Sequence, residues 1–232
     1  MLEELDLVDF KSKHKLTFTT TKKEIEQDKR FDAEYFQPKY EEIIEKIKSY
    51  KGGFDKVGEV VNIKDKNFTS KDYVKYKYVA LADISNDGYI QSFEEDFGKN
   101  LPTRARRLIN KGDVIISSIE GSLNSCALIE EEFDNSICST GFYVVNSERI
   151  NPETLLVLMK LYPIQKLLKK GCKGTILTAI PKDELEKIVL PIIDNQTQQK
   201  ISQKIQESFK LKKELKELLE KAKKMVEEEI EK

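Results

Sequence analysis

The sequence predicts a mixed α/β fold in which a strand-rich globular part is followed by one long C-terminal helix. Two changes in the hydrophobic pattern support this prediction. Between residues 54 and 145, apolar residues gather in short segments separated by turn sequences such as Asn86-Asp87-Gly88, a pattern typical of strands. Residues 195–232 contain no Gly or Pro, and their apolar side chains recur at helical spacing.

The composition is that of a highly charged globular chain. The 232 residues include 40 Lys and Arg against 41 Asp and Glu, which excludes a uniformly basic nucleic-acid binder but is compatible with one basic face. Three cysteines and one histidine lack the paired spacing of a zinc site. Free thiols, no signal peptide and no apolar run long enough to span a bilayer predict a cytoplasmic protein without a membrane role.

The first part of the chain is predicted to contain one well-formed helix. Residues 1–29 form a polar lead with a short strand around Leu5–Phe10, and residues 22–29 are expected to be loosely structured. His14 is interpreted as a solvated surface residue. Asp32 is a candidate N-cap for a helix with an apolar face from Tyr35 to Ile47. Gly52-Gly53 is expected to end that helix.

The central part is predicted to consist of short strands. The best candidates are residues 57–63, 76–84, 113–118, 126–129 and 141–145. Between the second and third of these, Thr103 is expected to cap a short helix that carries Arg104, Arg106 and Arg107.

The last part of the globular region is predicted to be mainly helical. Asn151-Pro152 is a typical helix start, with an N-cap followed by proline at the first helical position. Pro163 breaks or kinks this helix, and a second segment ends at Gly171. A glycine-rich turn at 171–176, a helical turn at 181–186 and a short strand at 187–191 are expected to follow.

The C-terminal helix is predicted to begin at a capping box formed by Asn195 and Gln198. At 1.5 Å per residue it is roughly 55 Å long, so its outer part cannot bury its apolar stripe on its own domain and needs another helix. That helix belongs to this chain or to another, and a homodimer through this stripe is one such arrangement. The predicted interface residues are Ile201, Ile205, Leu211, Leu215, Leu218, Leu219, Ala222, Met225 and Val226.

Independent catalysis is not supported by any motif. Cys138 has no histidine besides His14 to activate it. Gly121-Ser122 lacks the second glycine of a nucleophile elbow, and Lys173-Gly174-Thr175 lacks the preceding phosphate-binding loop.

Polyanion binding is better supported, because basic residues occur together with short polar and aromatic residues in the strand-rich region. Arginine and lysine neutralise phosphates or pair with guanine, and asparagine pairs with adenine. The candidate DNA-contacting residues are Lys64, Lys66, Asn67, Lys71, Tyr76, Arg104, Arg106, Arg107, Asn124 and Lys173. By contrast, Ile115, Ile116, Phe142 and Val144 are interpreted as core.

Several short stretches, in this order, resemble a known family. They are Arg30-Phe-Asp-Ala-Glu-Tyr-Phe-Gln-Pro-Lys-Tyr40, Tyr78-Val-Ala-Leu-Ala-Asp-Ile84, Lys111-Gly-Asp-Val-Ile-Ile-Ser-Ser118, Ser139-Thr-Gly-Phe142, Gly174-Thr-Ile-Leu-Thr-Ala-Ile-Pro181, Ile188-Val-Leu-Pro191 and Gln199-Lys-Ile201. From about residue 30 onward, the chain is similar to a half-length specificity subunit of a type I restriction–modification system.

The resemblance implies a domain organisation and a function. It implies a DNA target recognition domain with a twisted sheet at residues 30–194 and a long coiled-coil spacer helix at 195–232, and it does not cover the lead at 1–29. Full-length members carry two such domains and two antiparallel helices, so this chain would supply one half-site. The implied partners are double-stranded DNA, an adenine methyltransferase subunit that brings S-adenosylmethionine, and a motor–nuclease subunit that uses ATP and Mg²⁺. No cofactor is expected in this chain.

Two other readings remain open at this point. In the first, the chain is an interaction scaffold with a dimerising coiled coil and no DNA role. In the second, it is a recognition fragment of a single-chain restriction enzyme. A small-molecule enzyme is a third reading, but it needs catalytic residues that the sequence does not offer.

Overall fold

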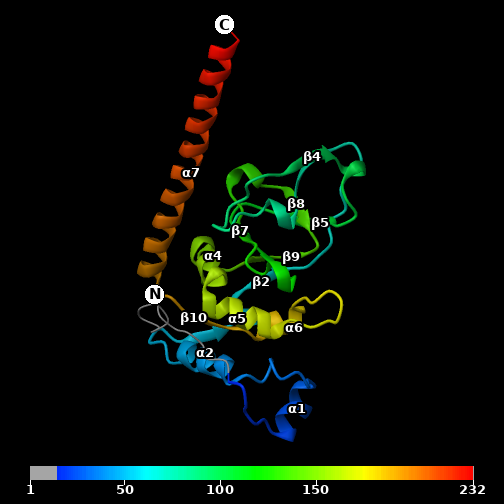
Figure 1. Ribbon diagram of the computed structural model, residues 1–232, viewed down its shortest axis with the longest axis vertical. Helices are drawn as coiled ribbons and strands as arrows, with labels where there is room; N and C mark the ends of the chain where they lie inside the picture. Colours follow the sequence, from blue (N-terminus) through cyan, green and yellow to red (C-terminus); the bar gives the residue numbers. More distant parts are fainter. Residues whose placement is uncertain (1–14, 232) are drawn as a thin grey trace.

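The computed structural model describes residues 15–231 and shows a layered globular part from which one long helix projects (Figure 1). The predicted strand around Leu5–Phe10 and His14 lie outside the described residues. The helices are α1 Lys22–Asp28, α2 Pro38–Lys48, α3 Val57–Val60, α4 Pro152–Lys160, α5 Tyr162–Gly171, α6 Lys182–Lys187 and α7 Asn195–Ile230.

Ten strands form three sheets within the described part of the chain. The strands are β1 Phe54–Lys56, β2 Asn62–Lys64, β3 Lys75–Val79, β4 Glu94–Phe97, β5 Ala105–Ile109, β6 Val114–Ser117, β7 Cys126–Leu128, β8 Ser136–Ser139, β9 Phe142–Asn146 and β10 Val189–Pro191. Their orders are β1-β10, β2-β9-β6-β7 and β4-β3-β8-β5. The mixed α/β fold with a long C-terminal helix is therefore confirmed.

The sheet β2-β9-β6-β7 is the central layer, and both of its faces are buried. In a strand, successive side chains point to opposite faces. Val114 and Ile116 pack with the helices, whereas Ile115 packs toward the second sheet. This two-sided burial explains why β6 is apolar at three successive positions, and it confirms the core assignment of Ile115, Ile116, Phe142 and Val144, each at most 1% exposed.

The second sheet, β4-β3-β8-β5, covers the side of the central sheet that faces away from the helices. Val79, Ile109 and Cys138 of this sheet join Ile115 and Val144 of the central sheet in one apolar cluster. The pairing of β3 with β8 is parallel, while β4 and β5 pair antiparallel with their neighbours. This arrangement leaves β4 and β5 as the two edge strands.

Several predicted boundaries were wrong. Residues 57–63 form the short helix α3 followed by β2 instead of one strand, because Val57 and Val60 both face the core at helical spacing. Where a short helix carrying Arg104, Arg106 and Arg107 was predicted, residues Ala105–Ile109 form strand β5, whose pairing with β8 gives it backbone partners that outweigh local helix propensity.

The N-terminal segment also differs from its prediction. Residues 22–28 form helix α1, which begins at a capping box between Thr21 and Glu24. Asp32 is not the N-cap of α2: its carboxylate accepts a hydrogen bond from the Tyr35 backbone at 3.0 Å in a turn, and α2 begins only at Pro38. Gly53, with φ of 82°, follows the end of α2, in keeping with the predicted stop.

The helices α4 and α5 form as predicted. The Asn151 side chain accepts a hydrogen bond from the Thr154 backbone at 2.8 Å, and Pro152 occupies the first turn. Pro163 lies in the first turn of α5, where its missing amide hydrogen costs nothing. After the turn, Lys173 and Ala179 form an isolated antiparallel bridge.

The start of α7 differs in chemistry from the predicted capping box. Asp194 is the N-cap and accepts a hydrogen bond from the Thr197 backbone. Gln198 is only 4% exposed and joins three segments. Its Oε1 accepts from the Asn151 backbone at 2.7 Å, and its Nε2 donates to the carbonyls of Arg149 and Ile193 at 3.0 and 2.9 Å. The first turn of α7 is therefore bonded to the start of α4.

The first half of α7 lies on the globular part, and the second half does not (Figure 1). Gln206 donates to Glu153 at 2.7 Å, the Phe209 ring meets Tyr89 edge-to-face, and Lys212 pairs with Asp87. Ile201 and Ile205 are half-buried in this single chain. The remaining predicted interface residues are exposed, namely Leu211, Leu215, Leu218, Leu219, Ala222, Met225 and Val226. Within residues 15–231, no helix has the length and apolar content needed to cross a membrane.

Replacing Gln198 by alanine is expected to lower the free energy of unfolding by about 3 kcal/mol, because it leaves buried backbone groups at Asn151, Arg149 and Ile193 without partners. Urea unfolding of the purified chain measures this. Gln199→Ala, one residue on and exposed, is the matched control and should change stability by less than about 0.5 kcal/mol. Equal effects of the two variants would contradict the proposed junction.

Candidate nucleic-acid interface

The edge strand β5 presents an exposed row of arginines. Its backbone pairs with β8, but the register shifts between Ala105 and Arg107. Such a bulge interrupts the alternation of side chains between the two faces of the sheet. Ala105 and Ile109 point into the protein, while Arg104 and Arg106 are exposed. Neither of these two side chains has a hydrogen-bond or ion-pair partner among residues 15–231, so both guanidinium groups are available to a ligand.

The loop that follows β2 lies against β5. The Phe68 backbone donates to the Arg106 carbonyl at 2.8 Å. The Arg107 guanidinium donates to the Asp65 carbonyl and, at 3.1 Å, to the Asn67 side chain. Two candidate regions that are about forty residues apart in sequence are thus brought together on one surface.

A lysine that the sequence analysis missed completes this surface. Lys182, at the start of α6, pairs with the Asp65 carboxylate at 2.5 Å, and this hydrogen bond holds the pKa of Asp65 below its ordinary value. No local sequence pattern distinguishes Lys182 from other surface lysines. We define the β5 basic cluster as Lys66, Arg104, Arg106, Arg107 and Lys182.

Two of the predicted contact residues, Lys64 and Lys173, form ion pairs with carboxylates of the same chain. The ammonium of Lys64 lies 2.6 Å from buried Asp113 and 3.2 Å from Asn110. Lys173 pairs with Glu184 at 2.9 Å and with Asp183 at 3.9 Å. Each lysine therefore contributes less positive potential than an unpaired surface lysine.

The last three predicted contact residues lie at different distances from the β5 basic cluster. Lys71 is exposed, and Tyr76 is half-buried beneath it, edge-on to Phe68, with its hydroxyl accepting from the Lys71 backbone. Asn124 lies apart from them, between β6 and β7, where Lys160 of α4 donates to its carbonyl at 2.9 Å. The structure thus places Lys71 and Tyr76 near the loop after β2 and separates Asn124 from it.

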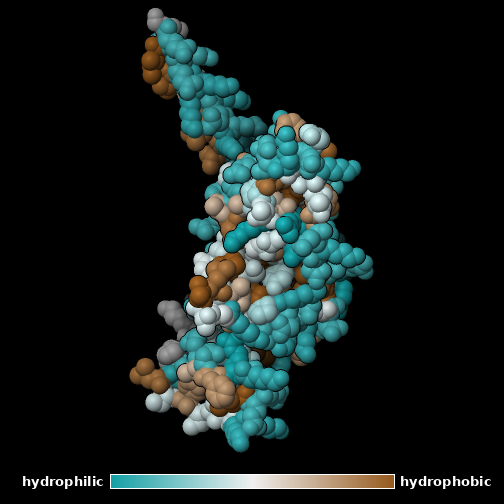
Figure 2. Space-filling view, turned by 90° about the vertical axis from the view of Figure 1, so that its right-hand side faces the viewer, coloured by the Kyte–Doolittle hydropathy of each residue, from teal (hydrophilic) through white to brown (hydrophobic). Residues whose placement is uncertain are grey.

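The β5 basic cluster is connected to the loop after α5, residues 173–179, by backbone hydrogen bonds. The Thr140 backbone donates to the Arg104 carbonyl, and Ser118 donates to the carbonyl of neighbouring Gly141, each at 2.8 Å. The Ile180 backbone then donates to the Ser118 carbonyl at 2.8 Å. In Figure 1, this loop, α6 and β5 lie on the side of the globular part opposite α7. Figure 2 views this face, which is mostly hydrophilic with small apolar patches.

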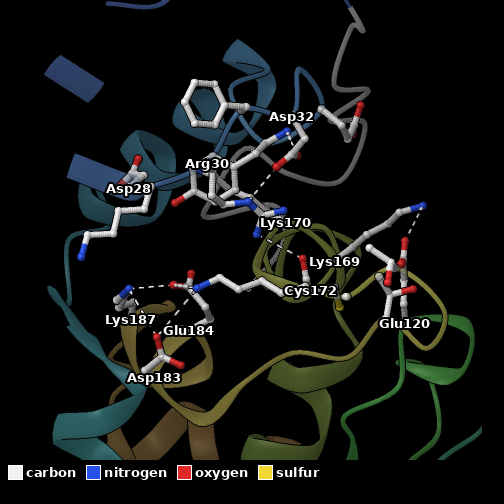
Figure 3. Close-up of a pocket in the computed structure, with 18 of the residues that line it drawn as sticks. Asp28, Arg30, Asp32, Glu120, Lys169, Lys170, Cys172, Asp183, Glu184 and Lys187 are labelled. Carbon is white, nitrogen blue, oxygen red and sulfur yellow. Dashed lines mark hydrogen bonds and ion pairs between the residues drawn. The ribbon is translucent and has the colours of Figure 1, made fainter. Parts of the chain in front are cut away.

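A pocket of about 860 Å³ lies between the N-terminal segment and the base of the 173–179 loop (Figure 3). Arg30 holds the two parts together. Its guanidinium donates to the Cys172 carbonyl at 3.1 Å and pairs with Asp32 at 2.7 Å, and its carbon Cζ lies 4.5 Å from the centre of the Tyr35 ring. The nearby ammonium of Lys170 lies 4.6 Å from the same ring centre.

The charges of this pocket largely neutralise one another. Burial alone would raise the pKa of Glu184, but hydrogen bonds from Lys187 and Lys173 outweigh it and hold the pKa below its ordinary value. Burial lowers the pKa of Lys170 and raises that of Tyr35 to about 12. With lysines facing carboxylates in this way, the pocket fastens the N-terminal segment to α5 and is not an open anion site.

The three cysteines are buried among apolar residues. Burial raises the pKa of Cys126 to about 12 and that of Cys172 to about 11, and it also raises the pKa of Cys138. Thiols of this kind are not nucleophiles near neutral pH, so all three side chains serve as core.

Comparison with known proteins relates the chain as a whole to a DNA specificity domain. Residues 51–221 match the model of the type I restriction modification DNA specificity domain. The type I restriction enzyme HindI specificity subunit of Haemophilus influenzae is 27% identical over 150 residues, which are 62% of this chain and 32% of that protein.

Two solved structures are similar in sequence and fold. The HsdS subunit from Thermoanaerobacter tengcongensis is 27% identical with a TM-score of 0.60, over 72% of this chain and 45% of that one. A chain from a study of complex assembly and conformational transition of the type I R-M system is 28% identical with a TM-score of 0.59, over 75% and 46%. The present chain spans less than half of each of these relatives.

Replacing Arg104 and Arg106 together by alanine is expected to weaken binding to duplex DNA by about tenfold and to reduce the salt slope of log K by about 2, because each free guanidinium neutralises about one phosphate. Fluorescence anisotropy over a series of salt concentrations measures both quantities. Lys200→Ala with Lys216→Ala removes the same charge from α7 and should leave the slope unchanged. A double-arginine variant with the wild-type slope would remove β5 from the interface.

Proposed function

Because the chain belongs to the type I restriction–modification DNA specificity domain family, we propose that it is a non-catalytic specificity subunit that binds one half of a DNA target. The β5 basic cluster carries this proposal. Two arginines without a partner among residues 15–231, two lysines and an arginine bonded to Asn67 occupy one exposed edge. Together they offer both phosphate neutralisation and bidentate contacts to base edges.

The hydrogen bonds and packing that hold this edge in place favour sequence-specific recognition over non-specific electrostatic binding. The strand β5 is paired with β8, and its inward residue Ile109 is fully buried. The loop after β2 is fixed to β5 by backbone and side-chain hydrogen bonds. Side chains held on a strand lose little freedom on binding, which favours discrimination between base pairs.

We propose that a second copy supplies the other half of a two-part target. The apolar stripe on the outer half of α7 is exposed, with Leu215 at 66% and Met225 at 71%. We propose that two copies pair these stripes antiparallel, so that each copy contributes one half-site across a twofold axis.

Other subunits supply the chemistry in this proposal. An adenine methyltransferase subunit would dock on the helices and bring S-adenosylmethionine, and a motor–nuclease subunit would use ATP and Mg²⁺. The contribution of this chain is to place its β5 edge in a groove and so present one adenine to the methyltransferase.

One observation favours a second candidate, an interaction scaffold without a DNA role. The exposed stripe of α7 suits any helical partner. The scaffold reading gives no role to the unpartnered arginines of β5, whereas the specificity reading uses both features. A recognition fragment of a single-chain restriction enzyme uses both as well, and it differs by the absence of a separate methyltransferase gene beside it.

Deleting the gene is expected to abolish one adenine methylation motif of the host, because the methyltransferase loses its guide to DNA. Methylome sequencing of the strain with and without the gene measures this. A motif made of two symmetric halves with a gap indicates two identical recognition domains. An unchanged methylome would contradict the specificity role.

Replacing Leu215 and Leu219 together by glutamate is expected to weaken self-association by at least about a hundredfold, because burying each leucine contributes about 1.5–3 kcal/mol per chain. Light scattering after size-exclusion chromatography measures the mass. Gln199→Glu with Gln203→Glu adds the same charge at exposed positions of α7 and should leave the mass unchanged. A double-leucine variant that stays dimeric would place the interface elsewhere.

A further inference from the structure

The 173–179 loop is a closed, preformed structure. Lys173 and Ala179 exchange two backbone hydrogen bonds, of 2.8 and 3.0 Å, across its base. Gly174 has a φ of 129°, and a Cβ added there would lie 2.6 Å from the Leu177 carbonyl oxygen. Only glycine fits this position, so the shape of the loop is specified by the chain.

The tip of this loop presents aliphatic side chains to solvent. Ile176 is 99% exposed and Leu177 is 59% exposed. A single exposed apolar residue is common on protein surfaces. Here, however, two adjacent ones lie at the tip of a loop whose base is fixed, and no element among residues 15–231 covers them. Burying these two side chains against a partner would stabilise the complex, whereas leaving them in solvent contributes no stability to the free chain.

The base of the loop is fixed from two sides. Arg30 donates to the Cys172 carbonyl at 3.1 Å, directly before the loop (Figure 3). On the other side, the Glu120 backbone donates to the Thr178 carbonyl at 3.0 Å. The tip is therefore held at a set position relative to the globular part.

The position of the loop favours DNA as the partner that covers it. The hydrogen bonds through Ser118, Gly141 and Thr140 connect the loop to Arg104 of the β5 basic cluster. The helix α7, whose exposed stripe suits a protein partner, lies on the opposite side of the globular part (Figure 1). A rigid apolar tip beside a basic surface matches the wedges that enter DNA grooves and loosen base stacking.

We propose that Ile176 is an apolar wedge that enters a DNA groove next to the β5 basic cluster and packs against the base pairs, separating one base step. This proposal rests on the proposed function, since it names how the same face engages DNA. An aliphatic wedge makes no phosphate contact, so its effect on affinity is independent of salt concentration.

The test uses the complex with its methyltransferase subunit and a duplex that carries the methylated motif, with 2-aminopurine placed at successive positions. Wild-type complex is expected to increase 2-aminopurine fluorescence at one step near each half-site. Ile176→Ala is expected to abolish that increase and to weaken DNA binding by about tenfold, with an unchanged salt slope. Leu16→Ala, at a leucine that is 94% exposed and far from residue 176 in sequence, is the control and should behave as wild type.

Three outcomes would overturn the proposal. The first is an Ile176→Ala variant with wild-type affinity and fluorescence. The second is a changed salt slope, which would indicate a phosphate contact. The third is weaker binding of the methyltransferase subunit without DNA, measured by calorimetry, which would make the loop a protein-docking element. If wild-type complex itself shows no preference for the motif, the proposed function fails, and that result is distinguishable from all three.

Discussion

One buried amide, that of Gln198, connects the long helix to the globular part. Its side chain forms hydrogen bonds with the backbone of Asn151, Arg149 and Ile193. Arg149 and Asn151 lie directly before α4, and Ile193 lies directly before α7. An amide with three buried partners is satisfied in one geometry only. The direction of α7 is therefore set at its first turn, and the contacts of Gln206 and Lys212 further along extend the same alignment.

The order of elements was predictable where burial imposes a simple period. Residues of β6, β7 and β9 are apolar because the central sheet is covered on both faces, and each of these strands was anticipated. The strands β4 and β5 were missed, since edge strands keep charged side chains. In β5, only Ala105 and Ile109 are buried, and pairing with β8, about thirty residues away, decides its conformation.

The candidate site was predictable in its residue types but not in its assembly. Charge and asparagine content pointed to Asn67 and Arg107. The hydrogen bond between them, however, joins residues that are 40 positions apart in sequence and forms only because the fold brings them together. The same limit applies to paired charges. Lys64 looks like a free cation in sequence, but its partner Asp113 is 49 residues away. Local patterns identify groups that are able to bind phosphate, while tertiary contacts decide which of them remain free.

The placement of the two exposed features on opposite sides has a physical consequence for assembly. The β5 edge faces away from α7 (Figure 1), so the proposed pairing of two α7 helices would leave both β5 edges uncovered. Since α7 is bonded to its domain at Gln198 and braced at Lys212, its orientation is transmitted to the β5 edge through packed elements instead of a flexible linker. In the proposed dimer, the register of the helix pair would set the separation of the two DNA half-sites. Symmetry would supply the second recognition face, and helix length would supply the gap between the half-sites.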